Sequence, residues 1–165
     1  MNNKKLFIEW AEYASRADSL ANAVGAKTVF IGKVNKHKNL FYSFSSYPSK
    51  IIENYKVIKK ENPSVVYITN TNWIVAFVNL LFSKKFGHKL ILDSHSCAFD
   101  HEFIKYPLPL SKRFAKCADL SIVTNESHYH LLKENKAKVL IISDIPFEDK
   151  LITNDKITLS NKFNI

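Results

Sequence analysis

The sequence feature that most constrains the fold is a short apolar run with no alternation, Leu90-Ile91-Leu92. A strand of this kind is buried on both faces, which is typical of a parallel sheet covered by helices. The run is followed at once by Asp93, Ser94, His95 and Ser96. Because open α/β sheets bind ligands beyond the carboxyl ends of their strands, we expect these polar side chains to face a substrate.

Apolar runs of this type alternate with segments of helical periodicity along the chain. Strands are predicted at 6–8, 28–31, 65–69, 89–92, 120–124 and 139–142, and helices at 15–24, 48–62, 73–86, 110–118 and 126–135. Right-handed crossovers then favour an α/β fold, a Rossmann-like three-layer α/β/α domain with a mainly parallel sheet of about six strands. We expect this domain to span residues 1–146, with 147–165 as a linker or tail toward an absent second domain.

Local signals predict where two of the helices begin. Ser15 with Asp18 three residues later has the form of a capping box, and Gly25 predicts the end of that helix. Pro48 is suited to the first turn of the next helix.

The net charge of +9 favours anionic partners, although it also fits a role in solubility alone. The beginning of the chain lacks the features of a signal peptide, and the longest apolar run is too short to cross a bilayer. We therefore expect a cytoplasmic protein, or one peripheral on the cytoplasmic face of a membrane, with Cys97 and Cys117 reduced.

Several common site motifs are absent from the sequence. It contains no GxGxxG, no GxxxxGK[ST] and no GxSxG, and its three glycines cannot build a glycine-rich phosphate cradle. Asp93, His95, Asp100 and His101 could in principle hold a metal, but they lack a fixed ligand spacing, so we expect no metal site.

Polar residues instead follow several of the predicted strands, at the edge where ligands of such sheets bind. Glu9 and Trp10 stand after the first strand. The residues predicted to bind substrate are Ser15, Arg16, Asn70, Asn72, Ser94, Ser96 and Asn125. Each asparagine has the alternative of being only a capping or turn residue.

An ordered set of segments gives the chain a family resemblance. The set is Ser15-Arg16 with Leu20–Gly25, then Lys60–Val66, Ile91–Ser96, Ala118–Asn125 and Asp144-Ile145-Pro146. Together these segments resemble the amino-terminal domain of GT-B glycosyltransferases with a glycosyltransferase 4-like first domain. The glycine-rich first loop of many members is replaced here by Ala11–Ala14.

The resemblance implies that this domain binds the acceptor, while a carboxy-terminal domain or partner subunit binds the nucleotide-sugar donor. It implies His95 and Asp93 as catalytic residues. It also implies that this domain binds no cofactor of its own and that the donor belongs to the complete enzyme. The expected function is sugar transfer to a glycan or lipid-linked acceptor, as in polysaccharide biosynthesis.

Two features leave other partners open. A basic set of side chains and an apolar helix beginning at Trp73 would suit a lipid-linked acceptor at an anionic membrane surface, although burial of that helix by the sheet is the favoured explanation of its apolar residues. The basic residues are Lys84, Lys85, Lys112, Arg113 and Lys116. The alternative function is a non-catalytic Rossmann-like binding module for nucleic acid or a protein partner. Nucleic acid is the less expected partner, because no aromatic-basic recognition motif is present.

Overall fold

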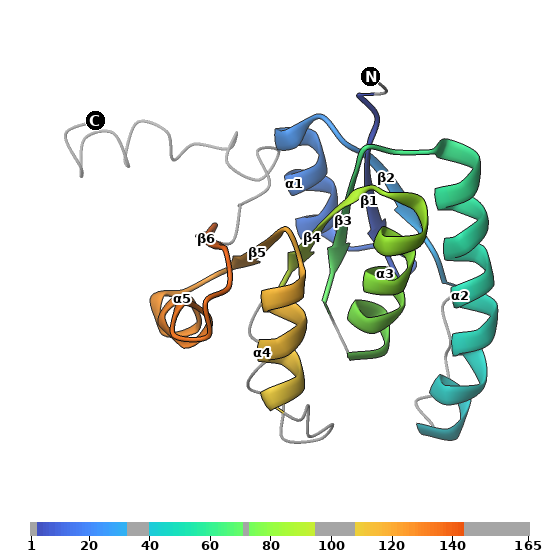
Figure 1. The fold of residues 1–165 in the computed structure, drawn as a ribbon. Helices are drawn as coiled ribbons and strands as arrows, with labels where there is room; N and C mark the ends of the chain where they lie inside the picture. Colours follow the sequence, from blue (N-terminus) through green and yellow to red (C-terminus); the bar gives the residue numbers. More distant parts are fainter. Residues whose placement is uncertain (1–2, 33–39, 71–72, 95–107, 144–165) are drawn as a thin grey trace, which may run out of the picture.

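The computed structural model describes residues 3–32, 40–70, 73–94 and 108–143. Within them, six strands form one parallel sheet in the order β2-β1-β3-β4-β5-β6 (Figure 1). This confirms the predicted Rossmann-like α/β fold. The predicted domain boundary after residue 146 lies outside the described residues. The strands are β1 (Lys5–Glu9), β2 (Lys27–Phe30), β3 (Val65–Thr69), β4 (Lys89–Asp93), β5 (Leu120–Val123) and β6 (Val139–Ile141), and the helices are α1 (Ser15–Val24), α2 (Leu40–Glu61), α3 (Trp73–Phe86), α4 (Leu108–Cys117) and α5 (Glu126–Lys133).

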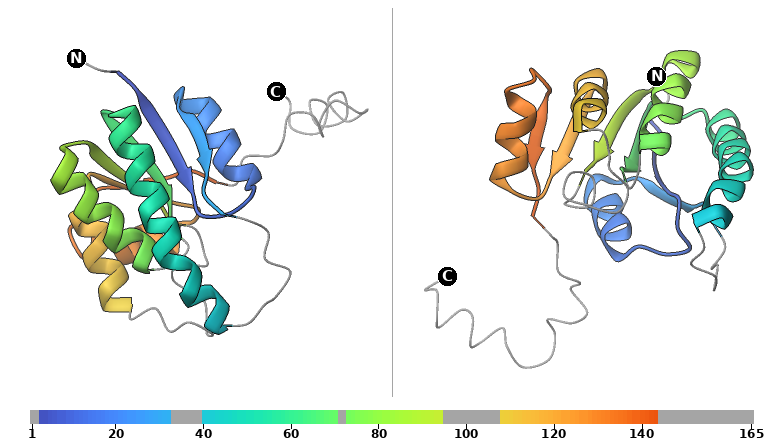
Figure 2. Two further views of the ribbon diagram at one scale, coloured as in Figure 1. Left: turned by 90° about the vertical axis from the view of Figure 1, so that its right-hand side faces the viewer. Right: turned by 90° about the horizontal axis from the view of Figure 1, so that it is seen from below.

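The strand order determines which face of the sheet each helix covers. The chain passes from β1 to β2 in one direction across the sheet, and every later connection runs in the other direction. Because such crossovers are right-handed, α1 lies on one face and the remaining helices on the opposite face. Figure 2 shows α1 alone on its side of the sheet, across from α2, α3 and α4.

Alternation along the buried strands divides the core into two layers. Leu6 and Ile8 of β1 face the larger layer, which also contains Ile58 of α2 and Leu80 of α3. Phe7 faces the smaller layer under α1, where its ring stacks on that of Tyr67 at a centroid distance of 5.9 Å; the other buried members of this layer are Ala17, Leu20, Ala21 and Ile122.

Helix α1 has the predicted bounds, but its capping residue differs from the prediction. Gly25 has the left-handed conformation, φ 65°, and its N–H bonds to the last helical carbonyls. The predicted cap at Ser15 is wrong: the capping residue is Ala14, which has no side chain able to cap, and Ser15 is already helical. A residue inside the helix cannot reach the first-turn amides as a capping hydroxyl does.

Helix α2 also differs from the prediction at its start. It begins at Leu40, so Pro48 lies inside the helix and not in its first turn. A proline there removes one main-chain hydrogen bond and costs about 3 kcal/mol in an isolated helix. Packing opposes this cost, because Tyr47 and Ile51 on either side of the proline both contact the core. The position of a proline therefore did not mark where this helix begins.

Helices α2 and α3 share a buried polar contact. The Asn54 side-chain amide donates to Asn79 Oδ1 at 3.0 Å, and the Asn79 amide donates to the Val75 carbonyl at 2.9 Å. Both asparagines are fully buried. Asn79, which interrupts the apolar pattern of α3 in the sequence, thus joins the two helices.

Candidate functional site

Three buried polar side chains lie in adjacent strands at the carboxyl edge of the sheet. Thr69 and Asp93 are register partners in β3 and β4. Glu9 ends β1 one residue beyond the partner pair Ile8 and Ile68, which places it beside Thr69. All three residues are at least 95% buried. The register of a parallel sheet therefore brings together residues that are far apart in the sequence.

Arg16, in helix α1, binds Asp93 at this edge. Arg16 Nε donates to Asp93 Oδ2 at 3.0 Å, and Arg16 Nη2 donates to Asp93 Oδ1 at 2.9 Å. This two-bond fork is the strong geometry of an arginine–carboxylate pair. The guanidinium also donates to the main-chain carbonyls of Ile142 at 3.2 Å and Ser143 at 3.3 Å. Arg16 thereby connects α1, β4 and the chain that leaves β6.

Asn70 and Ser94 form a second buried pair beside the first. The Asn70 amide donates to Ser94 Oγ at 2.9 Å, and the Asn70 main-chain N–H donates to the Asp93 carbonyl at 2.8 Å. The Ser94 N–H donates in turn to the Ile122 carbonyl at 2.8 Å. These bonds continue the ladder of the sheet past the last strand residues, so both side chains are held in fixed positions.

Glu9 gives the site a titratable group that sequence reasoning placed at this edge but did not assign to the site. Burial raises the pKa of the Glu9 carboxyl to about 7; the Asp93 charge also raises it, while the Thr69 hydroxyl and the Lys50 ammonium act in the opposite direction. Lys50 reaches this region from α2 and donates to the Trp10 carbonyl at 3.2 Å. A carboxyl with this pKa can both hold and release a proton near neutral pH.

Three buried polar atoms here have no hydrogen-bond partner within the described part of the chain. They are Glu9 Oε2, Thr69 Oγ1 and the indole nitrogen of Trp10. A buried polar group without a partner costs about 1–3 kcal/mol, so such groups need an explanation such as a bound ligand. The glutamate that follows the first apolar strand could have suggested this site. The same sequence pattern is also found where such a glutamate is exposed to solvent at the end of a strand.

The remaining predicted residues fall into two groups. Ser15 is exposed at the start of α1, and Asn125 caps α5, accepting from the His128 N–H at 2.9 Å through Oδ1. His95, Ser96 and Asn72 lie outside the described residues. The structure thus brings together Arg16, Asn70, Asp93 and Ser94, and the substrate-binding roles of the predicted residues stay predictions.

Within the described ranges, no group of three or more His, Cys, Asp or Glu side chains could hold a metal ion. Of the four residues considered for a metal in the sequence, only Asp93 is described. In the same residues, no helix is both long and apolar enough to pass through a bilayer.

The six-stranded parallel sheet with helices on both faces is a Rossmann-like α/β domain. Its similarity to solved structures extends over most of the chain. The crystal structure of Anabaena Alr3699/HepE in complex with UDP has a TM-score of 0.55 and 11% identity, covering 98% of this chain and 50% of that one. That of Glycyrrhiza uralensis UGT73P12 complexed with glycyrrhetinic acid 3-O-monoglucuronide has a TM-score of 0.50 and 9% identity, covering 87% of this chain and 49% of that one.

These similarities establish the fold, and the predicted resemblance to GT-B enzymes is confirmed at that level. The chain spans about half the length of each of the two solved structures. No family model matches the sequence, and no curated protein matches it either.

Proposed function

We propose that this chain is the acceptor-binding half of a GT-B glycosyltransferase. In this proposal the enzyme transfers a sugar from a nucleotide-sugar donor to a glycan or lipid-linked acceptor. The two similar structures hold UDP and a glucuronide of glycyrrhetinic acid, which are the kinds of ligand that such a reaction uses. Because the chain spans half of each structure, the donor is expected to bind a carboxy-terminal domain or a partner subunit.

The observation that carries the proposal is the set of unmatched polar atoms at the carboxyl edge of the sheet. Glu9 Oε2 and Trp10 Nε1 are buried without a hydrogen-bond partner in the described residues. They offer an acceptor and a donor, which is the combination that sugar hydroxyls can satisfy. The fixed Arg16–Asp93 and Asn70–Ser94 pairs beside them would keep such a site preorganised.

Within this function we assign different roles to the polar residues. Both Asp93 oxygens bind Arg16, so we assign Asp93 a positioning role. His95 remains our candidate for the acid or base of the transfer. Glu9, with its pKa near 7, is a second candidate for proton transfer.

A transfer assay tests the proposal with the full chain and with a candidate donor-binding domain encoded in the same or an adjacent reading frame. Release of nucleotide from the donor should require both components. In the active mixture, His95→Ala should lower turnover by roughly 10²- to 10⁴-fold with an unchanged Tm. Glu12→Gln, an exposed change near the same edge, is the matched control and should leave turnover unaltered.

Two results would contradict the proposal. Turnover by the isolated chain would show that the donor site is not on another domain. No turnover with any such partner, together with steeply salt-dependent binding to DNA or RNA, would favour the alternative of a non-catalytic binding module.

A further inference from the structure

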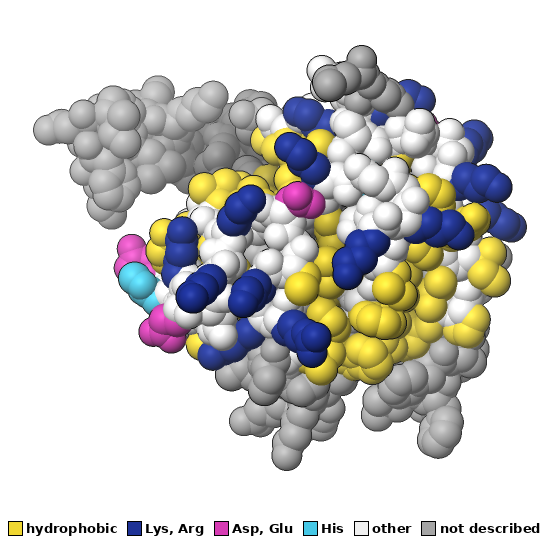
Figure 3. All heavy atoms as spheres, viewed as in Figure 1, with side chains coloured by type: hydrophobic (Ala, Val, Ile, Leu, Met, Phe, Trp, Pro, Cys, Tyr) yellow, Lys and Arg dark blue, Asp and Glu magenta, His cyan; other side chains and the backbone are white. Residues whose placement is uncertain are grey.

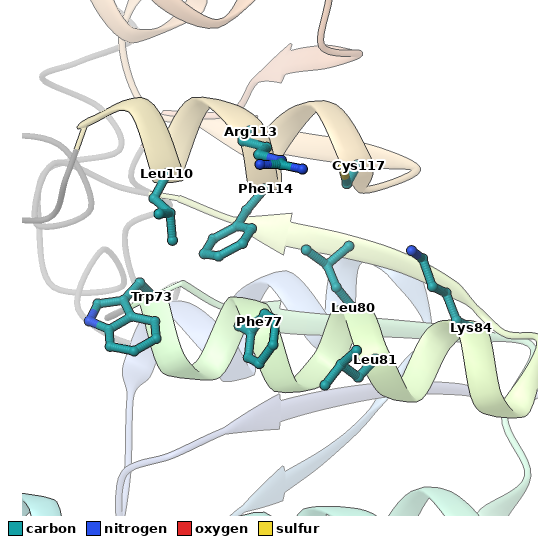
Figure 4. A pocket seen from close by; sticks show the side chains of 9 residues that line it. All are labelled: Trp73, Phe77, Leu80, Leu81, Lys84, Leu110, Arg113, Phe114 and Cys117. Carbon is teal, nitrogen blue, oxygen red and sulfur yellow. The ribbon is translucent and has the colours of Figure 1, made fainter.

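An open apolar groove lies between α3 and α4. Its volume is about 430 Å³, and its floor and walls are mainly Phe77, Leu80, Leu110 and Phe114. Figure 4 shows Leu110 and Phe114 of α4 pointing toward Trp73 and Phe77 of α3. The rings of Phe77 and Phe114 are 6.2 Å apart, centroid to centroid.

One side of the groove exposes large apolar side chains to solvent. Trp73, Phe77 and Leu81 recur at intervals of four along α3, so they form one stripe, and they are 38%, 44% and 49% exposed. The same helix buries Val75, Ala76 and Val78 against the sheet. Helix α3 is therefore apolar on two sides, and only one of them is used by the core of this domain.

The charged side chains of the two helices that form the groove have a single sign. Helices α3 and α4 contain no acidic residue and five basic ones: Lys84, Lys85, Lys112, Arg113 and Lys116. Lys84 and Arg113 line the groove itself. None of the ion pairs found within the described residues involves these five side chains. Figure 3 shows Lys and Arg side chains bordering a hydrophobic area on this side of the molecule.

We propose that this groove and its basic rim are a docking surface for an anionic membrane leaflet. Aromatic and aliphatic side chains at the centre would enter the interfacial layer, and Lys and Arg around them would contact anionic headgroups. A protein partner would need an acidic surface with apolar side chains at its centre. An anionic bilayer has negatively charged headgroups above an apolar layer over its whole surface. The attachment is peripheral, since it uses only the surface of two helices.

The position of the groove relates this surface to the proposed function. Helix α3 follows β3 after three intervening residues, so its first residue, Trp73, lies at the carboxyl edge of the sheet, near Thr69 and Asn70. If the acceptor is lipid-linked, docking here would present its sugar beside that edge. Only this last step rests on the proposed function, because vesicle binding is measured without any transfer reaction.

Co-sedimentation of the full chain with phospholipid vesicles tests the proposal. The chain should sediment with vesicles of phosphatidylcholine containing phosphatidylglycerol, and far less with phosphatidylcholine alone. Phe77→Ser with Leu81→Ser should weaken binding roughly tenfold or more, because both side chains lose their apolar contact with lipid. Ile52→Ser is the matched control, since Ile52 is 54% exposed on α2 and should not affect binding.

A second set of variants tests the charges without altering the apolar stripe. Lys112→Gln with Arg113→Gln should weaken binding by about fivefold per charge, and high salt should weaken wild-type binding in the same way. Lys59→Gln with Lys60→Gln, at the end of α2, is the control and should bind as wild type does. Circular dichroism verifies that each variant is folded.

The proposal is overturned if the wild-type chain stays in the supernatant with anionic vesicles, or if the folded Phe77/Leu81 variant sediments as wild type does. It is also overturned if the wild type binds a single-stranded oligonucleotide but no vesicle. Failure of the transfer assay with intact vesicle binding would reject the glycosyltransferase function and leave the docking surface standing.

Discussion

Arg16 connects more parts of the candidate site than the other residues described there. Its side chain pairs both oxygens of Asp93, a residue that is 99% buried, and it also donates to the carbonyls of Ile142 and Ser143 after β6. A buried ion pair adds little net stability relative to an apolar replacement, but breaking it leaves an uncompensated charge. Arg16 is therefore expected to act on stability as well as on any ligand.

We expect Arg16→Ala to lower the free energy of unfolding by roughly 3–5 kcal/mol, because it leaves the Asp93 carboxylate buried without its cation. Arg16→Lys should restore only part of the loss, since an ammonium cannot form the two-bond fork. The double variant Arg16→Ala with Asp93→Asn should lose less than the sum of the two single changes. Urea denaturation of the wild type, the three single variants and the double variant measures these losses.

Arg113→Ala provides the control for these measurements, because Arg113 is exposed and forms no ion pair among the described residues. It should change stability by no more than about 0.5 kcal/mol. A loss below about 1 kcal/mol for Arg16→Ala would mean that the pair with Asp93 is dispensable to the fold.

At the scale of the elements, the contact between α2 and α3 depends on the two buried asparagines. Asn79→Ala should destabilise the fold by roughly 1–3 kcal/mol, because the Asn54 amide then loses its acceptor in a dry interface. Asn54→Leu with Asn79→Leu should cost less than Asn79→Ala alone, because it removes both polar groups together. Thermal unfolding followed by circular dichroism compares the variants. A double variant less stable than Asn79→Ala would indicate that shape, and not hydrogen bonding, governs this contact.

The elements also show how far sequence reasoning reaches. The bounds of β3 and α3 were predicted at the residues where the structure has them, because local signals such as Asn-Thr-Asn before Trp73 and Gly87 after Phe86 coincide with the ends of the periodic pattern. The start of α2 was missed, because packing around Pro48 overrides its preference for a first turn. The bounds of α1 were predicted, but its capping residue is Ala14 and not Ser15. Asn125 is a cap, which was the open alternative for that residue.

The candidate site was harder to predict than the fold. The sequence indicated that Arg16, Asn70 and Asp93 would meet at one edge, because parallel strands bring their carboxyl ends together. It could not indicate that Arg16 would bind Asp93 across 77 residues, since this depends on the position of α1 over the sheet. The burial of Glu9 likewise depends on what covers the end of β1.

At the scale of the whole molecule, two buried groups give stability opposite pH dependences. Glu9 has a pKa of about 7 in the fold against 4.5 when unperturbed, so its contribution to stability is complete below pH 4.5 and is lost as the pH rises through 7. His88 precedes β4, and burial lowers the pKa of its imidazole from 6.5 to about 4, although Asp119 acts in the opposite direction. Stability from His88 is complete above pH 6.5 and is lost as the pH falls through 4.

Each group therefore contributes roughly 3 kcal/mol over its own range, and the two slopes cancel between about pH 4.5 and 6.5. Glu9→Gln should remove the loss of stability that Glu9 causes as the pH rises. The free energy of unfolding of this variant should therefore increase with pH across this range, relative to wild type. His88→Leu should remove the gain of stability that His88 causes as the pH rises. The free energy of unfolding of this variant should therefore decrease with pH, because only the effect of Glu9 remains. Urea denaturation at a series of pH values measures both, with Glu12→Gln as the control that retains the wild-type profile.

A Glu9→Gln curve parallel to that of wild type from pH 4.5 to 7 would show that Glu9 ionises in the folded protein as it does in water. A His88→Leu curve parallel to wild type between pH 4 and 6.5 would show the same for His88. In that case the imidazole would have to be open to solvent, and not buried as the structure places it.

The Arg16 side chain also has a consequence for the order in which the molecule is assembled. Its bond to the Ser143 carbonyl joins residues 127 positions apart. Contacts over such a separation form late and slow the folding of a chain, because a long loop must first be closed. During synthesis on the ribosome, the first strand and helix would emerge well before the segment that completes their hydrogen bonds. The nascent protein would thus carry an Arg16 side chain with incomplete hydrogen bonds until the last strand has joined the sheet.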